Sequence, residues 1–65
     1  MRLGNTKYVI VKKGFPIQFM MDGEEYDSIE DVYLFDSKDI AEEELNKYDE
    51  PYNFETIPVN ITYEF

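Results

Sequence analysis

The sequence contains no cysteine, no histidine and no tryptophan. Without cysteine the chain forms no disulfide, and without histidine as well it lacks the usual zinc ligands and the groups of most nucleophilic catalytic sites. Its apolar runs stay well below the roughly 20 residues that a membrane-spanning helix needs. These absences exclude disulfide scaffolds, zinc domains and thiol enzymes, so the fold must depend on side-chain packing.

The chain of 65 residues predicts one domain, 1–65. A domain of this size buries only about 60% of the surface that its unfolded chain exposes, so its stability is marginal. Six tyrosines and five phenylalanines offset this, because aromatic side chains bury large areas. We therefore expect an aromatic core, or a partner chain that completes one.

Export signals are not expected either. Met1-Arg2 is followed by no apolar segment, so no signal peptide is predicted. Asn60-Ile61-Thr62 matches the N-glycosylation pattern, which we interpret as chance because no secretory signal accompanies it. The sequence predicts a cytoplasmic protein.

Positive charge is scarce and unevenly placed. Fifteen acids accompany six cations, for a formal net charge of −9. Residues 1–21 contain four cations and no acid, residues 22–50 contain thirteen acids and two lysines, and residues 51–65 add two acids. Nucleic acid and anionic membranes are poor partners for such a chain, whereas a basic protein is a good one.

Several segments have the pattern of β-strands. Residues 7–12 are β-branched and aromatic, and residues 17–21 alternate after a Gly-Phe-Pro turn, which predicts a hairpin. Asp22-Gly23 is a signal for the tip of a second tight hairpin. Residues 54–65 alternate most regularly, and Pro58 within them indicates an edge strand or a strand's first residues.

One helix is predicted from Ser37 to Tyr48, capped by Asp36 or Ser37, with Ala41 and Leu45 on its apolar stripe. In this helix either Ile40 is only partly buried or Glu44 lies at the rim. Upstream of the helix, a single turn is expected at residues 28–31. Residues 32–35 are four consecutive apolar positions, which indicate a short strand or an extended segment covered on both faces.

The assembled prediction is an α+β fold in the order ββ(β)αβ. A three- or four-stranded antiparallel sheet carries one helix packed on one face, and the last strand pairs with the first hairpin. The other face of the sheet is expected to be open, and aromatic residues on it would favour a homodimer.

No catalytic constellation is found. The serines and threonines have no neighbouring base, and no glycine-rich phosphate loop is present. An EF-hand fails at Asp22, because glycine follows it immediately. The sequence therefore predicts no enzyme, no catalytic residue, no metal site and no cofactor.

The acids of the predicted helix are placed against local folding preference. Asp39 and Glu43 form a like-charge i,i+4 pair, which costs about 0.2–0.5 kcal/mol in an isolated helix. Asp49 and Glu50 follow the helix C-terminus, where the helix dipole favours cations. Solubility explains some of this charge. Its placement nevertheless points mildly to a function.

A functional interpretation is imitation of nucleic acid. Asp39, Glu42 and Glu43 place three charges within about 6 Å of helix rise. Duplex DNA carries roughly three or four charges over the same length. Acids before and after the helix would extend this track, and interleaved tyrosines would stack on arginines of a basic partner. The predicted partner-binding residues are Asp22, Glu24, Glu25, Asp27, Glu30, Asp31, Asp36, Asp39, Glu42, Glu43, Asp49 and Glu50.

Taken together, the chain opens with KYVIVKKG, continues with FDSKDIAEEEL and closes with FETIPVNITYEF. In this overall character it resembles the small acidic host-takeover proteins of lytic Bacillus phages, a group that includes a DNA mimic directed at the nucleoid protein HU. The resemblance implies competitive inhibition of a basic host DNA-binding protein, with HU as the leading candidate, and no direct binding of nucleic acid. The resemblance carries over no site residue, because no shared motif anchors one.

A second interpretation stays open. The chain would then be a protein-interaction module, dimeric through its sheet or binding along an edge strand, with the acids serving solubility. Charge reversal of the helix acids separates the two, because only the first interpretation makes partner binding depend on them.

Overall fold

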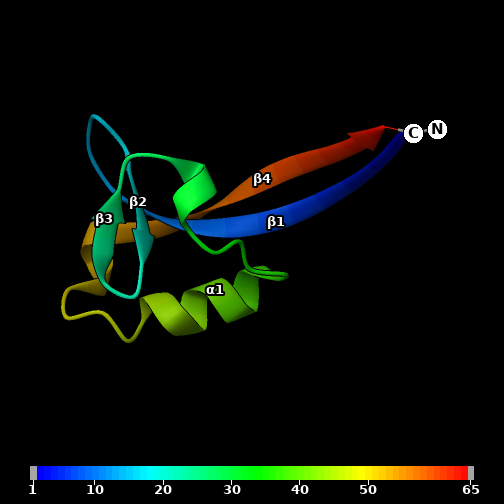
Figure 1. The fold of residues 1–65 in the computed structure, drawn as a ribbon. Coiled ribbons are helices and arrows are strands. Elements are labelled where there is room, and N and C mark those ends of the chain that lie inside the picture. The colour runs from blue at the N-terminus through cyan, green and yellow to red at the C-terminus, as the bar shows by residue number, and fades with distance from the viewer. Residues whose placement is uncertain (1, 65) are drawn as a thin grey trace.

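The backbone forms a four-stranded antiparallel sheet with strand order β3-β2-β1-β4 and one α-helix packed on it (Figure 1). The computed structural model describes residues 2–64. Its elements are β1 (Arg2–Lys12), β2 (Gln18–Met21), β3 (Glu24–Tyr26), the one-turn 3-10 helix η1 (Ile29–Asp31), α1 (Lys38–Leu45), the 3-10 helix η2 (Pro51–Asn53) and β4 (Phe54–Glu64). The predicted α+β fold and its order of elements are confirmed.

The β2–β3 connection is the tight hairpin that Asp22-Gly23 predicts. Met21 pairs with Glu24, so the loop contains two residues. Both loop residues have positive φ, 54° at Asp22 and 82° at Gly23, as a primed turn requires. Glycine adopts this backbone without cost and aspartate tolerates it better than most residues.

The core is centred on β1. Val9, Ile10 and Val11 are consecutive and each is at most 1% exposed. Because successive side chains of a strand point to opposite faces, both faces of the sheet are covered here. The expected open face is therefore wrong at the centre of the sheet.

Different elements cover the two faces. On one face Ile10, Met20 and Leu45 form the main cluster, with Phe35, Tyr48 and Phe54 packed against it. The η1 turn, drawn in green between β3 and α1, lies on the side of β1 opposite to α1 (Figure 1). The chain between β3 and α1 therefore passes from one side of β1 to the other.

Helix α1 is shorter than predicted. It begins after Ser37, whose hydroxyl accepts a hydrogen bond from the backbone N–H of Ile40 at 3.2 Å, and it ends at Leu45. No cation lies within its last turn, Asn46 is the C-cap, and Lys47 and Tyr48 continue only as turns before Asp49, Glu50 and Pro51. Ile40 is about half exposed, so of the two predicted alternatives the partly buried Ile40 is the one observed.

Residues 32–35 do not form the predicted strand. Only Tyr8 and Phe35 form a β-bridge, with hydrogen bonds of 2.9 and 2.7 Å between their backbones. Tyr33 is largely exposed, so the segment is not covered on both faces. The reason is competition for β1, since β2 already occupies its edge opposite residues 10–12.

Strands β1 and β4 pair without interruption from Arg2–Glu64 to Lys12–Phe54, so β1 begins five residues before its prediction. Residues 2–6 and 60–64 extend beyond the packed sheet as a two-stranded ribbon, which we call the arm, and residues 7–59 form the head (Figure 1). The molecule measures 43 × 24 × 17 Å. Strand β4 is an edge strand, as Pro58 predicts; Phe65, the last residue of the predicted strand, lies outside the described residues.

A core substitution tests this packing. We expect Ile10→Ala to lower the free energy of unfolding by about 2–5 kcal/mol, because it deletes a buried side chain at the centre of the cluster. Ile17→Ala is the matched control, since Ile17 is half exposed and its truncation should cost less than about 1 kcal/mol. Urea unfolding measures both, and equal losses would contradict the packing described.

Candidate protein-binding site

The net charge of the protein lies on the head. In the arm, Arg2 and Glu64 form an ion pair, with Arg2 Nε 3.0 Å from Glu64 Oε1, and their charges cancel. The arm contains no other Lys, Arg, Asp or Glu, so the formal charge of −9 belongs to the head. The head is therefore the surface to search for a site that binds a basic partner.

Most acids have no ion-pair partner among residues 2–64. Five of the fifteen acids pair with a cation: Glu64 with Arg2, Asp36 with Lys7, Glu25 with Lys12, Glu42 with Lys38 and Glu44 with Lys47. The remaining ten are Asp22, Glu24, Asp27, Glu30, Asp31, Asp39, Glu43, Asp49, Glu50 and Glu55. Exposed ion pairs of this kind contribute little to stability, so the unpaired acids are the informative group.

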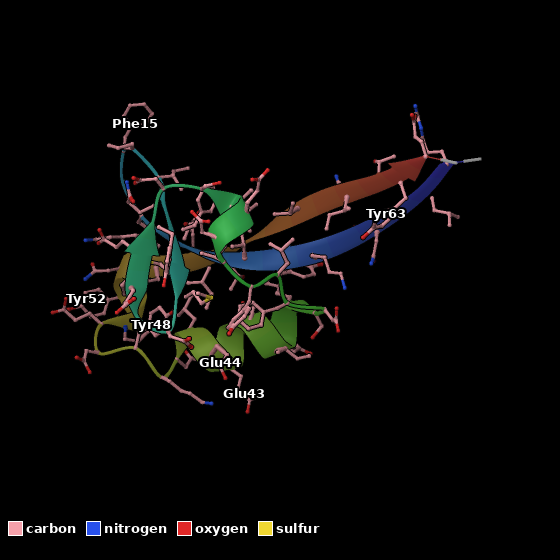
Figure 2. The ribbon with its side chains drawn as sticks, viewed as in Figure 1. Phe15, Glu43, Glu44, Tyr48, Tyr52 and Tyr63 are labelled. Carbon is pink, nitrogen blue, oxygen red and sulfur yellow. The ribbon has the colours of Figure 1, made fainter. Side chains whose placement is uncertain are left out.

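Four acids meet at one pocket. Asp22 comes from the β2–β3 turn, Glu44 from the end of α1, and Asp49 and Glu50 from the loop that follows. They line a surface pocket of about 630 Å³ together with Lys47, Tyr48 and Phe54. We call it the acidic pocket. It joins segments more than twenty residues apart in the sequence, and Figure 2 shows Glu44 and Tyr48 at this end of the molecule.

Two aromatic rings form the apolar part of the acidic pocket. The rings of Tyr48 and Phe54 are 5.0 Å apart between centroids and meet edge to face, at 86°. Both pack against the core cluster, so they are held in place by it. A pocket with an aromatic wall and carboxylates at its rim suits a guanidinium or ammonium group, which binds an aromatic face and pairs with carboxylates.

Two side chains of the acidic pocket, Tyr48 and Lys47, have raised pKa values. Burial raises the pKa of Tyr48, and the charges of Asp22 and Glu44 add to this, while a backbone hydrogen bond from Gly23 works in the opposite direction. A hydrogen bond to Glu44, 3.0 Å long, raises the pKa of Lys47. These shifts favour neutral tyrosine and charged lysine, as expected where negative charge accumulates.

The predicted acids fall into groups. Asp22, Asp49 and Glu50 meet at the acidic pocket, and Asp39, Glu42 and Glu43 lie on α1. Glu30 and Asp31 belong to η1, on the other side of β1 from α1 (Figure 1). Asp36 and Glu25 are held in ion pairs by cations of β1.

The edge strand β3 lies between these groups. The pKa of Tyr26 on β3 is raised, first by burial, then by a hydrogen bond to Glu24, with further contributions from Asp22 and Asp31. The pKa of Tyr26 is therefore raised by acids of both the β2–β3 turn and η1. Glu24 lies on β3, and Asp27 directly follows that strand.

Sequence reasoning missed part of the site. The sequence indicates for Glu44 only a place at the rim of the apolar stripe, because its position in the acidic pocket depends on the folding of the β2–β3 turn beside it. Phe15 is 99% exposed in the β1–β2 loop. Its position between Gly14 and Pro16 was a signal that could have indicated exposure, because turns lie at the surface.

Metal and membrane sites find no support in the described part of the chain. Among residues 2–64, no three acidic side chains gather closely enough to hold a metal ion. The same residues include no helix with the length and apolar character to cross a membrane.

Comparison with known proteins gives no relative. The sequence matches no family model, no curated protein and no solved structure. The function must therefore be argued from the head and its charge.

One substitution tests whether the helix acids oppose folding. We expect Glu43→Lys to raise the free energy of unfolding by about 0.5 kcal/mol, because the cation in the last turn of α1 and its attraction to Asp39 outweigh the lost attraction between Glu43 and Lys47. Urea unfolding at low salt measures the change. Glu64→Lys alters the net charge equally but lies in the arm, so an equal gain there would show only a general relief of repulsion.

A second variant tests the environment of Tyr48. Because its pKa is raised in the folded protein, the resulting stability is present below pH about 10 and is lost as the pH rises through the folded pKa. We expect Tyr48→Phe to lose less stability than the wild type between pH 8 and pH 11, measured by urea unfolding. Parallel pH profiles for the two proteins would contradict the shift, and unfolding at pH 7 provides the reference for each.

Proposed function

We propose that the head binds a basic DNA-binding protein in the place of DNA and thereby inhibits it. The observation that carries this proposal is the set of ten acids without an ion-pair partner in residues 2–64, nine of them between Asp22 and Glu50. A solvated surface of this charge repels itself and costs stability in a small domain. A basic partner turns the same charge into binding free energy and faster association.

The spacing of the helix acids supports the comparison with DNA. Asp39 and Glu43 are exposed on α1 and form no ion pair within residues 2–64, although the charge of Glu43 acts on Lys47. Glu42 is only loosely paired with Lys38, at 3.8 Å. The rise of these three acids along the helix is about 6 Å, close to the spacing of the same number of phosphates along duplex DNA. Because α1 is anchored through Ala41 and Leu45, these charges are held on a rigid element.

The acidic pocket adds a site for one side chain of the partner. DNA-binding proteins contact phosphates mainly with arginine and lysine. Such a side chain would lie against Tyr48 with its charge near Asp22, Asp49 and Glu50. Arginine suits the pocket better than lysine, because its planar guanidinium stacks on an aromatic ring and binds carboxylates through two hydrogen bonds. Phosphate imitation by α1 and capture of an arginine therefore act on the same partner.

The resemblance to phage host-takeover proteins directs the proposal to an HU-like nucleoid protein of a bacterial host. Other basic proteins that bind DNA would fit the same head. The partner would occupy the acidic head, and the neutral arm would remain outside the contact.

Displacement of DNA from HU tests the proposal. We expect the protein to release a fluorescently labelled duplex from purified HU, measured by anisotropy at about 50 mM salt, where the DNA itself stays bound without competitor. We expect Glu43→Lys to raise the protein concentration needed for half-displacement by about tenfold, which corresponds to a loss of roughly 1.4 kcal/mol of binding free energy. Glu64→Lys makes the same change in net charge in the arm and should leave the displacement close to that of the wild type.

The outcomes separate the partner from the mechanism. If Glu43→Lys and Glu64→Lys weakened the displacement of DNA equally, net charge alone would explain the binding. The proposed site on the head would then be wrong. The protein could fail to displace DNA from HU but capture another basic protein from a bacterial lysate. If duplex DNA then released that captured protein, it would replace HU as the partner, and DNA mimicry would still hold. Capture of no basic protein at low salt would contradict the proposal.

A further inference from the structure

The arm has one apolar face and one polar face. The register places Leu3 opposite Tyr63 and Asn5 opposite Ile61, so these four side chains share a face. The other face contains the Arg2–Glu64 ion pair, the Thr6–Asn60 hydrogen bond of 3.1 Å, and Gly4 opposite Thr62. Both charged groups of the arm lie on the polar face.

The apolar face of the arm is only partly covered by residues 2–64, since Ile61 is partly buried and its apolar neighbours are exposed. Leu3 is 51% exposed and Tyr63 is 50% exposed. Figure 2 shows Tyr63 far from the labelled residues of the head. A two-stranded ribbon on its own is at best marginally stable in water, and an amphipathic ribbon gains stability when its apolar face is covered. A partner that covers this face would therefore stabilise the arm itself.

The charge distribution of the protein indicates which partner fits the apolar face of the arm. The arm is neutral, whereas the head bears the whole charge of −9. Two copies of this chain repel wherever their heads approach, and the apolar face of the arm is a place where they can meet without bringing unpaired acids together. A basic protein gains nothing there, since its attraction is to the head.

We propose that two copies of this chain associate through their arms, apolar face to apolar face, about a two-fold axis with the arms antiparallel. A two-fold contact uses the same patch on both copies, so Leu3, Ile61 and Tyr63 of each copy cover those of the other. The antiparallel arrangement puts the two heads at opposite ends of the paired arms. Heads separated by more than a Debye length, about 8 Å at physiological salt, repel only weakly.

The size of the arm sets the strength of the association. Five residues of strand are about 17 Å long, and two strands are about 10 Å wide, so each copy contributes on the order of 200 Å². A stable interface buries about 800 Å² per partner. The dimer is therefore weak and reversible, and it forms at high protein concentration or when both heads engage one multivalent partner, where linkage raises the effective affinity.

Sedimentation equilibrium of the full chain tests this proposal apart from the proposed function. We expect the wild type to rise from 7.8 kDa toward twice that mass between about 10 µM and 1 mM, and to do so more at higher salt, because salt screens the repulsion of the heads. Partner binding by the head weakens with salt, so the two salt dependences have opposite signs.

Variants locate the contact on the apolar face. We expect Leu3→Ser/Tyr63→Ser to raise the dimer dissociation constant at least tenfold, because it removes the two large exposed side chains of the patch. Thr62→Ser, on the polar face of the same arm, is the matched control and should dimerise like the wild type. Circular dichroism and urea unfolding check that the head of each variant is folded.

Several results would overturn the proposal. A wild type that stays at 7.8 kDa over the whole range at low and high salt would exclude the dimer without reference to any variant. A mass beyond that of a dimer would exclude the closed two-fold contact. Equal dimerisation by the double variant, or equal loss in Thr62→Ser, would move the contact away from this face.

Discussion

The fold depends on strand β1, and specifically on three consecutive residues that are buried from both sides. Val9, Ile10 and Val11 lie where the elements of the head meet: β4 pairs with all three, β2 pairs with Ile10 and Val11, and α1 packs on the face of Ile10. The chain has no cysteine for a disulfide, and neither cysteine nor histidine for a structural zinc site. Every acid on α1 and in the loops is therefore positioned through the packing of this one strand.

This arrangement explains how a small domain can carry so much charge of one sign. Self-repulsion acts across the head, whereas the stabilising contacts are concentrated in a few buried side chains and the rings of Tyr48 and Phe54. Helix α1 ends early, at Leu45. Its last turn has no cation and the acidic loop follows, so charge repulsion opposes the packing of the helix there. Placing cations there would favour the helix and weaken the surface that we propose for binding. Such opposition between stability and function is common at binding sites.

The features that follow from local pattern were predictable, and those that depend on remote pairing were not. Alternation in β4 and the β-branched run at residues 7–12 predicted their strands, and Asp22-Gly23 predicted its hairpin. The first half of β1 includes Gly4 and Asn5, which have low strand propensity, and it is extended because β4 pairs with it. The acidic helix face was visible in the sequence. The acidic pocket was not, because its walls come from the β2–β3 turn and from residues 44–54, which no local periodicity connects.

The same uninterrupted pairing of β1 with β4 that builds the core also creates the arm, and this links the two proposed surfaces. Within the head, this pairing includes Val9, Ile10 and Val11, which are buried, whereas no residue of the arm is buried. A strand longer than the core requires costs conformational entropy for each ordered residue. Ordering the arm is more readily explained if its apolar face is covered by another molecule, and its neutrality makes a second copy of the same acidic chain an acceptable occupant. The molecule would then separate a charged end that contacts a basic partner from a neutral end that joins two such charged ends.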